Sequence, residues 1–128
     1  MSAGGKGAIV LVVDDEPAIR LLCRVNLELE GYDVREAATL AEARAAIEAE
    51  TPAVVLLDMH VGRDRGATLL TEIRLRQPRI AVALVTGSVE VEQGGGEVWD
   101  ADAIIVKPFT IDALIETVRA LAEAEDPR

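Results

Sequence analysis

Short apolar runs alternate along this chain of 128 residues with segments in which apolar residues recur every three or four positions. Four of the apolar runs end directly on polar residues. The runs and the residues that follow them are Ala8–Val13 with Asp14-Asp15, Ala53–Leu57 with Asp58, Ile80–Val85 with Thr86-Gly87, and Ala103–Val106 with Lys107-Pro108. Runs of this length and composition are typical of parallel strands that are buried on both faces. We therefore expect four such strands, each with polar chemistry at its carboxyl end.

The segment after the first strand has the features of a helix followed by another strand. Pro17 stands at a first helical turn, where its missing N–H is tolerated, and Gly31 supplies a C-terminal stop. The residues expected to face inward from this helix are Ile19, Leu22, Cys23 and Leu27. Tyr32–Glu36 follows as a further strand, so we expect five strands in all.

Three more helices are expected from apolar spacing and from capping residues. Thr39 can cap a helix that continues through Glu50, and Ala67–Arg76 has the spacing of another helix. Thr110 can cap the last helix, which has the most regular apolar stripe. The stripe consists of Ile111, Leu114, Ile115, Val118 and Leu121.

A weaker segment lies between the last two strands. A helix near Ser88–Trp99 would complete the alternation of strands and helices, but Gly94-Gly95-Gly96 interrupts it. Each glycine inside a helix costs about 1 kcal/mol relative to alanine. We expect a short or irregular helix here, and an early loop formed by the glycines is the alternative.

Strands that alternate with helices predict an α/β domain: a single doubly wound, five-stranded parallel sheet with helices on both faces. The expected strand order is 2-1-3-4-5. We expect this domain to cover residues 8–122, with flexible tails at 1–7 and 123–128. Strands one and three are neighbours in this order, so Asp14-Asp15 and Asp58 are expected to face each other.

Composition excludes several classes of protein. The formal net charge is -10 and no cluster of Lys or Arg is present, so direct binding of nucleic acid is not expected. No apolar stretch approaches the ~18 residues of a membrane span, and the N-terminus lacks the apolar core of a secretory signal. Cys23 is the single cysteine, which excludes a disulfide and favours core packing. We expect a cytoplasmic protein without a membrane segment.

The polar residues at the strand ends suit phosphoryl chemistry. Three carboxylates held close together repel one another unless a cation is present or their pKa values rise. Oxygen ligands of this kind favour Mg²⁺, which keeps several waters and leaves room for a phosphoryl oxygen. Lys107 adds a positive charge and Thr86 a hydroxyl, so Asp58 can be interpreted as a nucleophile that forms an acyl phosphate.

Each of these features has an ordinary interpretation when it is taken alone. An Asp-Asp pair before a helix is often an N-terminal cap, and Asp58 or Lys107 alone would be an ordinary loop residue. The phosphoryl interpretation depends on their occurrence together, at four strand ends of one sheet.

These motifs closely resemble the receiver domain of two-component response regulators over about Ala8–Ala122. The resemblance is carried by Asp14-Asp15-Glu16-Pro17, Asp58, Gly66, Thr86-Gly87 and Lys107-Pro108-Phe109. It implies that Asp58 is the phosphoacceptor, that Asp15 binds Mg²⁺ directly, and that Asp14 binds it through water. The backbone carbonyl of His60 would complete the protein's ligands. Lys107 and Thr86 would contact the phosphoryl oxygens, and the Lys107-Pro108 peptide is usually cis in this family.

The chain departs from the family pattern at two positions. Ile104 stands three residues before Lys107, where family members commonly have an aromatic residue that swings inward during signalling. Gly62 replaces a usual proline in the loop after the acceptor. His60 and Ser88 occupy positions that affect water access in the family, so they either tune dephosphorylation or are plain loop residues.

The expected function is therefore a signalling or relay module that accepts a phosphoryl group from a phosphohistidine and catalyses its own phosphorylation and dephosphorylation. Its expected partners are a sensor histidine kinase or a histidine phosphotransfer protein, and a downstream protein target. We expect no attached output domain. The alternatives are a receiver excised from a longer regulator or hybrid kinase, and an interaction module that works without phosphorylation. A phosphatase would need a general acid and substrate-recognition elements that the sequence does not offer.

Overall fold

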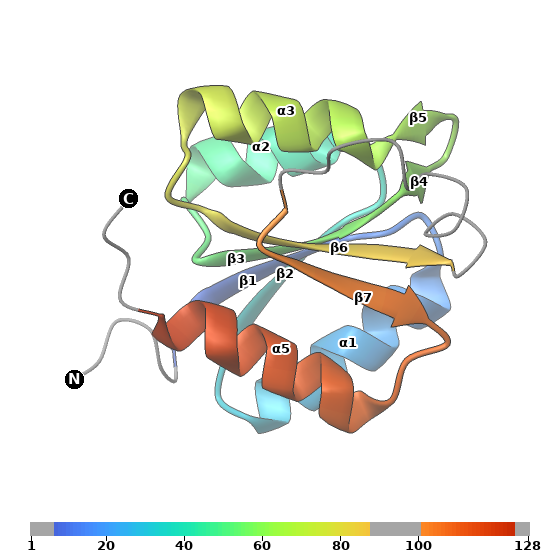
Figure 1. Ribbon diagram of the computed structural model, residues 1–128, viewed down its shortest axis with the longest axis vertical. Coiled ribbons are helices and arrows are strands. Elements are labelled where there is room, and N and C mark those ends of the chain that lie inside the picture. The colour runs from blue at the N-terminus through green and yellow to red at the C-terminus, as the bar shows by residue number, and fades with distance from the viewer. Residues whose placement is uncertain (1–6, 88–100, 125–128) are drawn as a thin grey trace.

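Five strands form one parallel sheet in the computed structural model, which describes residues 7–87 and 101–124 (Figure 1). The strands are β1 (Ile9–Val13), β2 (Asp33–Ala37), β3 (Val54–Asp58), β6 (Ala81–Gly87) and β7 (Ala103–Lys107). They are arranged in the order β2-β1-β3-β6-β7, and every neighbouring pair is parallel. The predicted α/β fold and the predicted strand order are confirmed.

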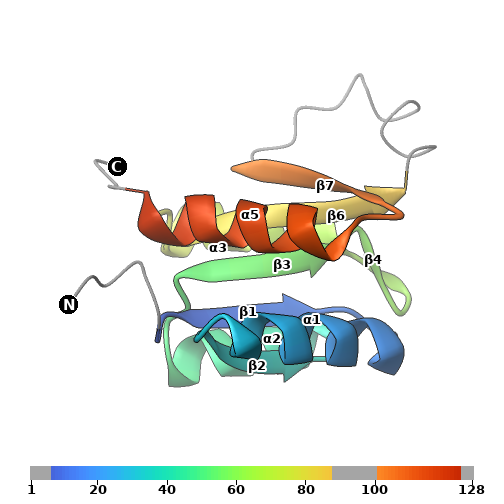
Figure 2. The ribbon, with the colours of Figure 1, turned by 90° about the horizontal axis from the view of Figure 1, so that it is seen from below.

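The helices lie in two layers, one on each face of the sheet (Figure 1). The layer on one face consists of α1 (Pro17–Leu29) and α5 (Ile111–Glu123), and both helices lie in front of the sheet in Figure 2. The other layer consists of α2 (Leu40–Ala49) and α3 (Gly66–Arg76). Each layer closes its own apolar core against the sheet, because both faces of the central strands are buried.

The two cores are almost entirely aliphatic, as the low aromatic content requires. Cys23 and Leu27 of α1 pack with Leu114 and Val118 of α5 against one face of the sheet. Cys23 is 3% exposed, and burial raises the pKa of its thiol to about 11. Core packing of this cysteine, as predicted, is confirmed.

Helix ends follow the sequence signals closely. The Thr39 hydroxyl accepts a hydrogen bond from the Glu42 backbone N–H at 3.0 Å, and Thr110 caps α5 in the same way through Ala113. Gly31 has a φ of +98°, which few residues other than glycine adopt, and it ends the first helical segment as predicted. These local bonds fix where the chain leaves each helix and re-enters the sheet.

Two features differ from the sequence expectation. Leu22 was expected to face inward, but it is 40% exposed, because the buried stripe of α1 runs through Cys23 and Leu27. The segment after β3 was interpreted as a loop, but it forms a small antiparallel hairpin. Its strands are β4 (His60–Val61) and β5 (Asp64–Arg65).

The predicted irregular helix near Ser88–Trp99 and the two predicted tails lie wholly or mainly outside the described residues. The domain limits of 8–122 therefore stay a prediction. Among the helices that the structure describes, none combines the length and the apolar character needed to cross a lipid bilayer.

Candidate functional site

The carboxyl ends of the parallel strands deliver the predicted polar residues to one edge of the sheet (Figure 1). Asp14 follows β1, and Asp58 is the last residue of the neighbouring β3. Asp15 joins them, and one carboxylate oxygen from each of the three lies within 4.8 Å of the others. We call Asp14, Asp15 and Asp58 the acid cluster. The structure therefore brings together the three carboxylates that sequence analysis placed near one another.

Asp14 is held at several points of its backbone and side chain. Only 3% of the surface of Asp14 is exposed to solvent. Its carboxylate accepts a hydrogen bond from the Glu16 backbone N–H at 2.9 Å, and its own N–H donates to the Ala37 carbonyl at 3.1 Å. The buried carboxylate thus also holds the turn that leads into α1, but it does not cap the helix, whose N-cap residue is Glu16.

Lys107 supplies a positive charge to the acid cluster from the end of β7. Its Nζ lies 3.4 Å from Asp58 Oδ1 and 3.8 Å from Asp14 Oδ2. The lysine is partly exposed, whereas both carboxylates are buried. The Lys107-Pro108 peptide is cis, as the resemblance implied.

The pKa values of these groups are displaced in the direction that crowded, buried charges require. Burial raises the pKa of the Asp14 carboxyl. Burial also raises the pKa of Asp58, and the negative charge of Asp14 raises it further. For Lys107, burial opposes the charged form, but the two neighbouring carboxylates outweigh this effect and its pKa is raised. One ammonium therefore does not neutralise the cluster.

The other predicted site residues lie close by in the fold. Thr86 is fully buried on β6, and its hydroxyl donates to the Gly87 carbonyl at 3.4 Å. The β6–β7 register places Thr86 opposite Val106 and Gly87 opposite Lys107. His60 is the first residue of β4, two residues after Asp58, and its side chain is exposed.

Two glycines fix the loop around Asp58. A side chain at Gly66 would collide with the Asp58 backbone carbonyl, so α3 can begin this close to β3 only with glycine. Gly62 has a φ of +64°, and its N–H donates to Asp15 Oδ2 at 3.2 Å. The usual proline of the family could provide neither this φ nor this donor. The departure at Gly62 is therefore coupled to the acid cluster.

Arg20 was missed by the sequence reasoning. It lies on α1, and its guanidinium donates to the Asp14 backbone carbonyl at 2.7 Å and to Glu36 Oε1 at 3.0 Å. No local sequence signal would have found this contact, because Glu36 is 16 residues away in the chain and on another element.

The donor set of the acid cluster fits a hard divalent cation. The three ligands are carboxylate oxygens, two of the carboxylates are buried, and burial raises the pKa values of Asp14 and Asp58. Oxygen-only ligands with one face open to solvent are suited to a cation that keeps part of its water shell. The residues present could therefore hold a metal ion.

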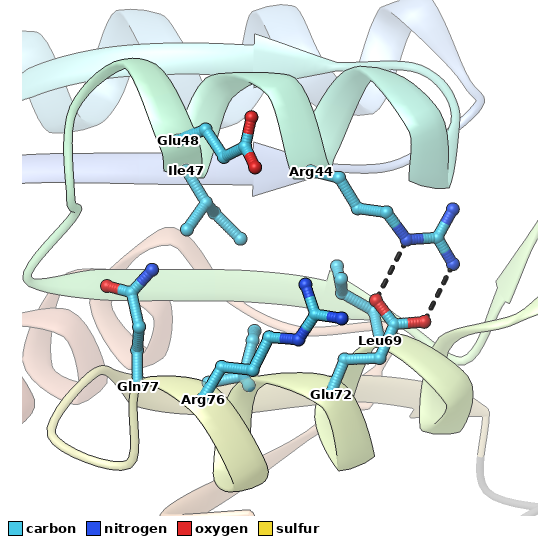
Figure 3. Close-up of a pocket in the computed structure, with 8 residues that line it drawn as sticks. Arg44, Ile47, Glu48, Leu69, Glu72, Arg76 and Gln77 are labelled. Atoms are coloured by element: carbon cyan, nitrogen blue, oxygen red, sulfur yellow. Dashed lines mark hydrogen bonds and ion pairs between the residues drawn. The ribbon is translucent and has the colours of Figure 1, made fainter.

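A surface hollow lies elsewhere in the molecule. It has a volume of about 220 Å³ and is situated between α2 and α3 (Figure 3). Ile47 and Leu69 line it, and the Arg44 guanidinium pairs with the Glu72 carboxylate at its rim. None of the predicted site residues lines this hollow. A second, smaller hollow is lined in part by Asp14 and Asp58.

Comparison with known proteins shows which family this chain is similar to. The family model described as the response regulator receiver domain matches residues 10–119. The chain is 35% identical to the transcriptional regulatory protein KdpE of Mycobacterium tuberculosis over 128 residues, covering 93% of this chain and 56% of that protein. It is 31% identical to the DNA-binding dual master transcriptional regulator RpaA of Synechocystis, covering 91% of this chain and 50% of that protein. The chain thus spans about half the length of these relatives.

A solved structure has the same architecture. The receiver domain of NtrX from Brucella abortus superimposes with a TM-score of 0.83 at 34% sequence identity. The alignment covers 91% of this chain and 99% of that one. Sequence and fold therefore point to the same family.

Proposed function

Because the chain belongs to the response regulator receiver domain family, we propose that it accepts a phosphoryl group on Asp58 from a phosphohistidine of a partner protein. Asp14, Asp15, Asp58 and the His60 backbone carbonyl would hold Mg²⁺. The observation that supports this proposal best is the under-compensated acid cluster beside Lys107, at the carboxyl ends of neighbouring strands.

The transfer follows from the placement of the chain's own groups. A carboxylate oxygen of Asp58 attacks the phosphorus, a new P–O bond forms, and the P–N bond of the phosphohistidine breaks. The departing imidazole nitrogen takes a proton from solvent. When bound, Mg²⁺ adds positive charge beside the phosphoryl oxygens. Lys107 is already 3.4 Å from Asp58, so its ammonium is placed to stabilise the negative charge of the transferred group.

The acyl phosphate is then lost by attack of water on the same phosphorus, which restores the Asp58 carboxylate. The chain is thus a phosphoacceptor that catalyses its own phosphorylation and dephosphorylation, and it turns over no separate substrate. His60 is exposed beside the acceptor, where its side chain can influence the approach of water. Its proposed partner in this role, Ser88, lies outside the described residues.

The proposed partners are a sensor histidine kinase or a histidine phosphotransfer protein in the cytoplasm, and a protein that reads the phosphorylated state. The net charge of -10 argues against contact of this domain itself with nucleic acid. Relatives of about twice the matched length are transcriptional regulators by name. A receiver within a longer regulator therefore stays an alternative to a stand-alone module.

One observation favours the alternative of an interaction module that works without phosphorylation. Ile104 is 46% exposed on β7, and an aliphatic side chain cannot reproduce the exchange of an aromatic ring between exposed and buried positions. A receiver-like interaction module that works without phosphorylation would tolerate this departure. The acid cluster has no role in such a module.

Intact-mass measurement separates these functions. The protein is incubated with Mg²⁺ and a small acyl-phosphate donor, and we expect one phosphoryl adduct. Asp58→Asn should abolish the adduct, whereas Asp64→Asn, which changes an exposed carboxylate of the adjacent hairpin, should retain it. Absence of an adduct at every Mg²⁺ concentration would favour the interaction module. Turnover of unrelated phosphoesters would favour a phosphatase.

A further inference from the structure

Arg20 connects Asp14 of the acid cluster with Glu36 on β2. Its Nη1 donates to the Asp14 backbone carbonyl at 2.7 Å, while its Nε donates to Glu36 Oε1 at 3.0 Å. The Arg20 side chain is 17% exposed. A guanidinium with two fixed acceptors in a mostly buried position has little freedom to move.

Glu36 holds Arg20 in this direction and is itself held by a second arginine. Arg24 donates to Glu36 Oε2 at 2.6 Å, so the carboxylate is bracketed by two guanidinium groups. The hydrogen bond from Arg24, together with that from Arg20, lowers the pKa of Glu36 and keeps it ionised. Arg24 also pairs with Glu28, but it makes no contact with Asp14.

The bond to the Asp14 carbonyl matters because of peptide geometry. The C=O of Asp14 and the N–H of Asp15 belong to one planar peptide unit. A donor that fixes the carbonyl therefore fixes the plane that joins the two residues, and with it the directions in which both side chains leave the backbone. The N–H and the carboxylate of Asp14 already form hydrogen bonds, so its carbonyl is the remaining polar group through which this turn can be held.

We propose that Arg20 is a positioning residue of the acid cluster: it fixes the Asp14–Asp15 peptide so that both carboxylates face Asp58 in a geometry suited to a divalent cation. Arg20 touches neither the cation nor the phosphoryl group. This inference rests on the proposed function, since it assigns a role in the same metal site.

Arg24 provides a control, because it pairs with the same Glu36 and makes no contact with Asp14. Mg²⁺ affinity of the full chain is measured by isothermal titration calorimetry for wild type, Arg20→Met and Arg24→Met, alongside urea denaturation of each. We expect Arg20→Met to weaken Mg²⁺ binding about tenfold, as loss of an outer contact to metal ligands commonly does. Arg24→Met should weaken it less than about twofold.

A second measurement distinguishes positioning from a general loss of structure. At saturating Mg²⁺, the initial rate of phosphorylation of Arg20→Met should return to within about twofold of wild type, because Asp58, Lys107 and Thr86 are unchanged. If Arg20→Met does not fold, Arg20→Lys keeps the charge with fewer donors and should bind Mg²⁺ about threefold more weakly than wild type.

Equal Mg²⁺ affinities for Arg20→Met and Arg24→Met would overturn the inference, as would a wild-type affinity in the Arg20→Lys fallback. A phosphorylation rate that stays low at saturating Mg²⁺ would also overturn it. Failure of wild type to bind Mg²⁺ at all is a different result, because it contradicts the proposed function itself.

Discussion

Two groups of mostly buried charges in this protein are built in opposite ways. Asp102, just before β7, accepts hydrogen bonds from Arg74 at 2.6 Å and from the Val82 backbone N–H at 2.8 Å. Arg74 in turn donates to the Ile80 carbonyl at 2.9 Å. Among the described residues, the Arg74 guanidinium meets the Asp102 carboxylate here through a short bond. At the acid cluster, one ammonium faces three carboxylates, and its two contacts are 3.4 and 3.8 Å long.

The difference separates a charge pair that stabilises the fold from a charge cluster that works against it. The Arg74–Asp102 pair ties α3 and β6 to the start of β7, and its charges cancel. The acid cluster leaves negative charge in a buried position, as functional sites commonly do. Removal of a carboxylate should therefore have opposite effects on stability in the two regions.

The largest effect is expected from Asp102→Ala. This change removes a carboxylate that bonds to Arg74, whose side chain is 13% exposed, and removes an acceptor from the Val82 N–H. The free energy of unfolding should fall by about 2–3 kcal/mol in urea denaturation. Glu72→Gln, at the more exposed pair with Arg44, is the control and should produce no measurable change. Equal effects of the two substitutions would remove the basis of the comparison.

Lys107→Met is expected to have a smaller effect that depends on metal. Without Mg²⁺, the loss of the ammonium leaves Asp14 and Asp58 to repel each other, and stability should fall by about 1–2 kcal/mol, since the lysine is partly exposed. Added Mg²⁺ should recover part of this loss. Urea denaturation with and without Mg²⁺ measures both values. A variant as stable as wild type without Mg²⁺ would show that Lys107 does not balance the cluster.

The pH dependence of stability sharpens the same point with the smallest expected effect. The folded pKa values of Asp14 and Asp58 are raised by burial, so the folded protein holds protons that the unfolded chain has already released. Their ionisation therefore costs stability as pH rises from the ordinary carboxyl range near ~4 through their raised values. Without Mg²⁺, lowering the pH from 7 towards the ordinary carboxyl range near ~4 should therefore restore part of this lost stability.

Asp14→Asn tests this assignment, because it removes one titrating carboxylate and relieves Asp58 of the negative charge that raises its pKa. Urea midpoints recorded between about pH 5 and 7 should change less steeply with pH in this variant than in wild type. Identical slopes would mean that the pH dependence arises elsewhere in the chain.

The sequence predicted the features that follow from strand direction. Asp14, Asp58, Thr86 and Lys107 each end an apolar run, and parallel strands send such residues to one edge. The contact between Arg20 and the Asp14 carbonyl could not be predicted, since it depends on where α1 lies over the end of β2.

The hairpin after Asp58 was missed for a different reason. Its strands have two residues each, which is too short for an alternating pattern, although Gly62 at the turn is a known hairpin signal. Leu22 shows the limit of helical spacing, since this signal indicates a stripe but locates its edge only to within one residue.

The central claim is that the acid cluster holds excess negative charge around Asp58, which a divalent cation neutralises. The most direct test is the free energy of unfolding of wild type and Asp58→Asn, each with and without Mg²⁺. We predict that without Mg²⁺ the variant is more stable than wild type by on the order of 1 kcal/mol. Mg²⁺ at 100 times its Kd should stabilise wild type by about 2.7 kcal/mol and the variant by much less. A less stable variant, or equal stabilisation of both proteins by Mg²⁺, would contradict the claim.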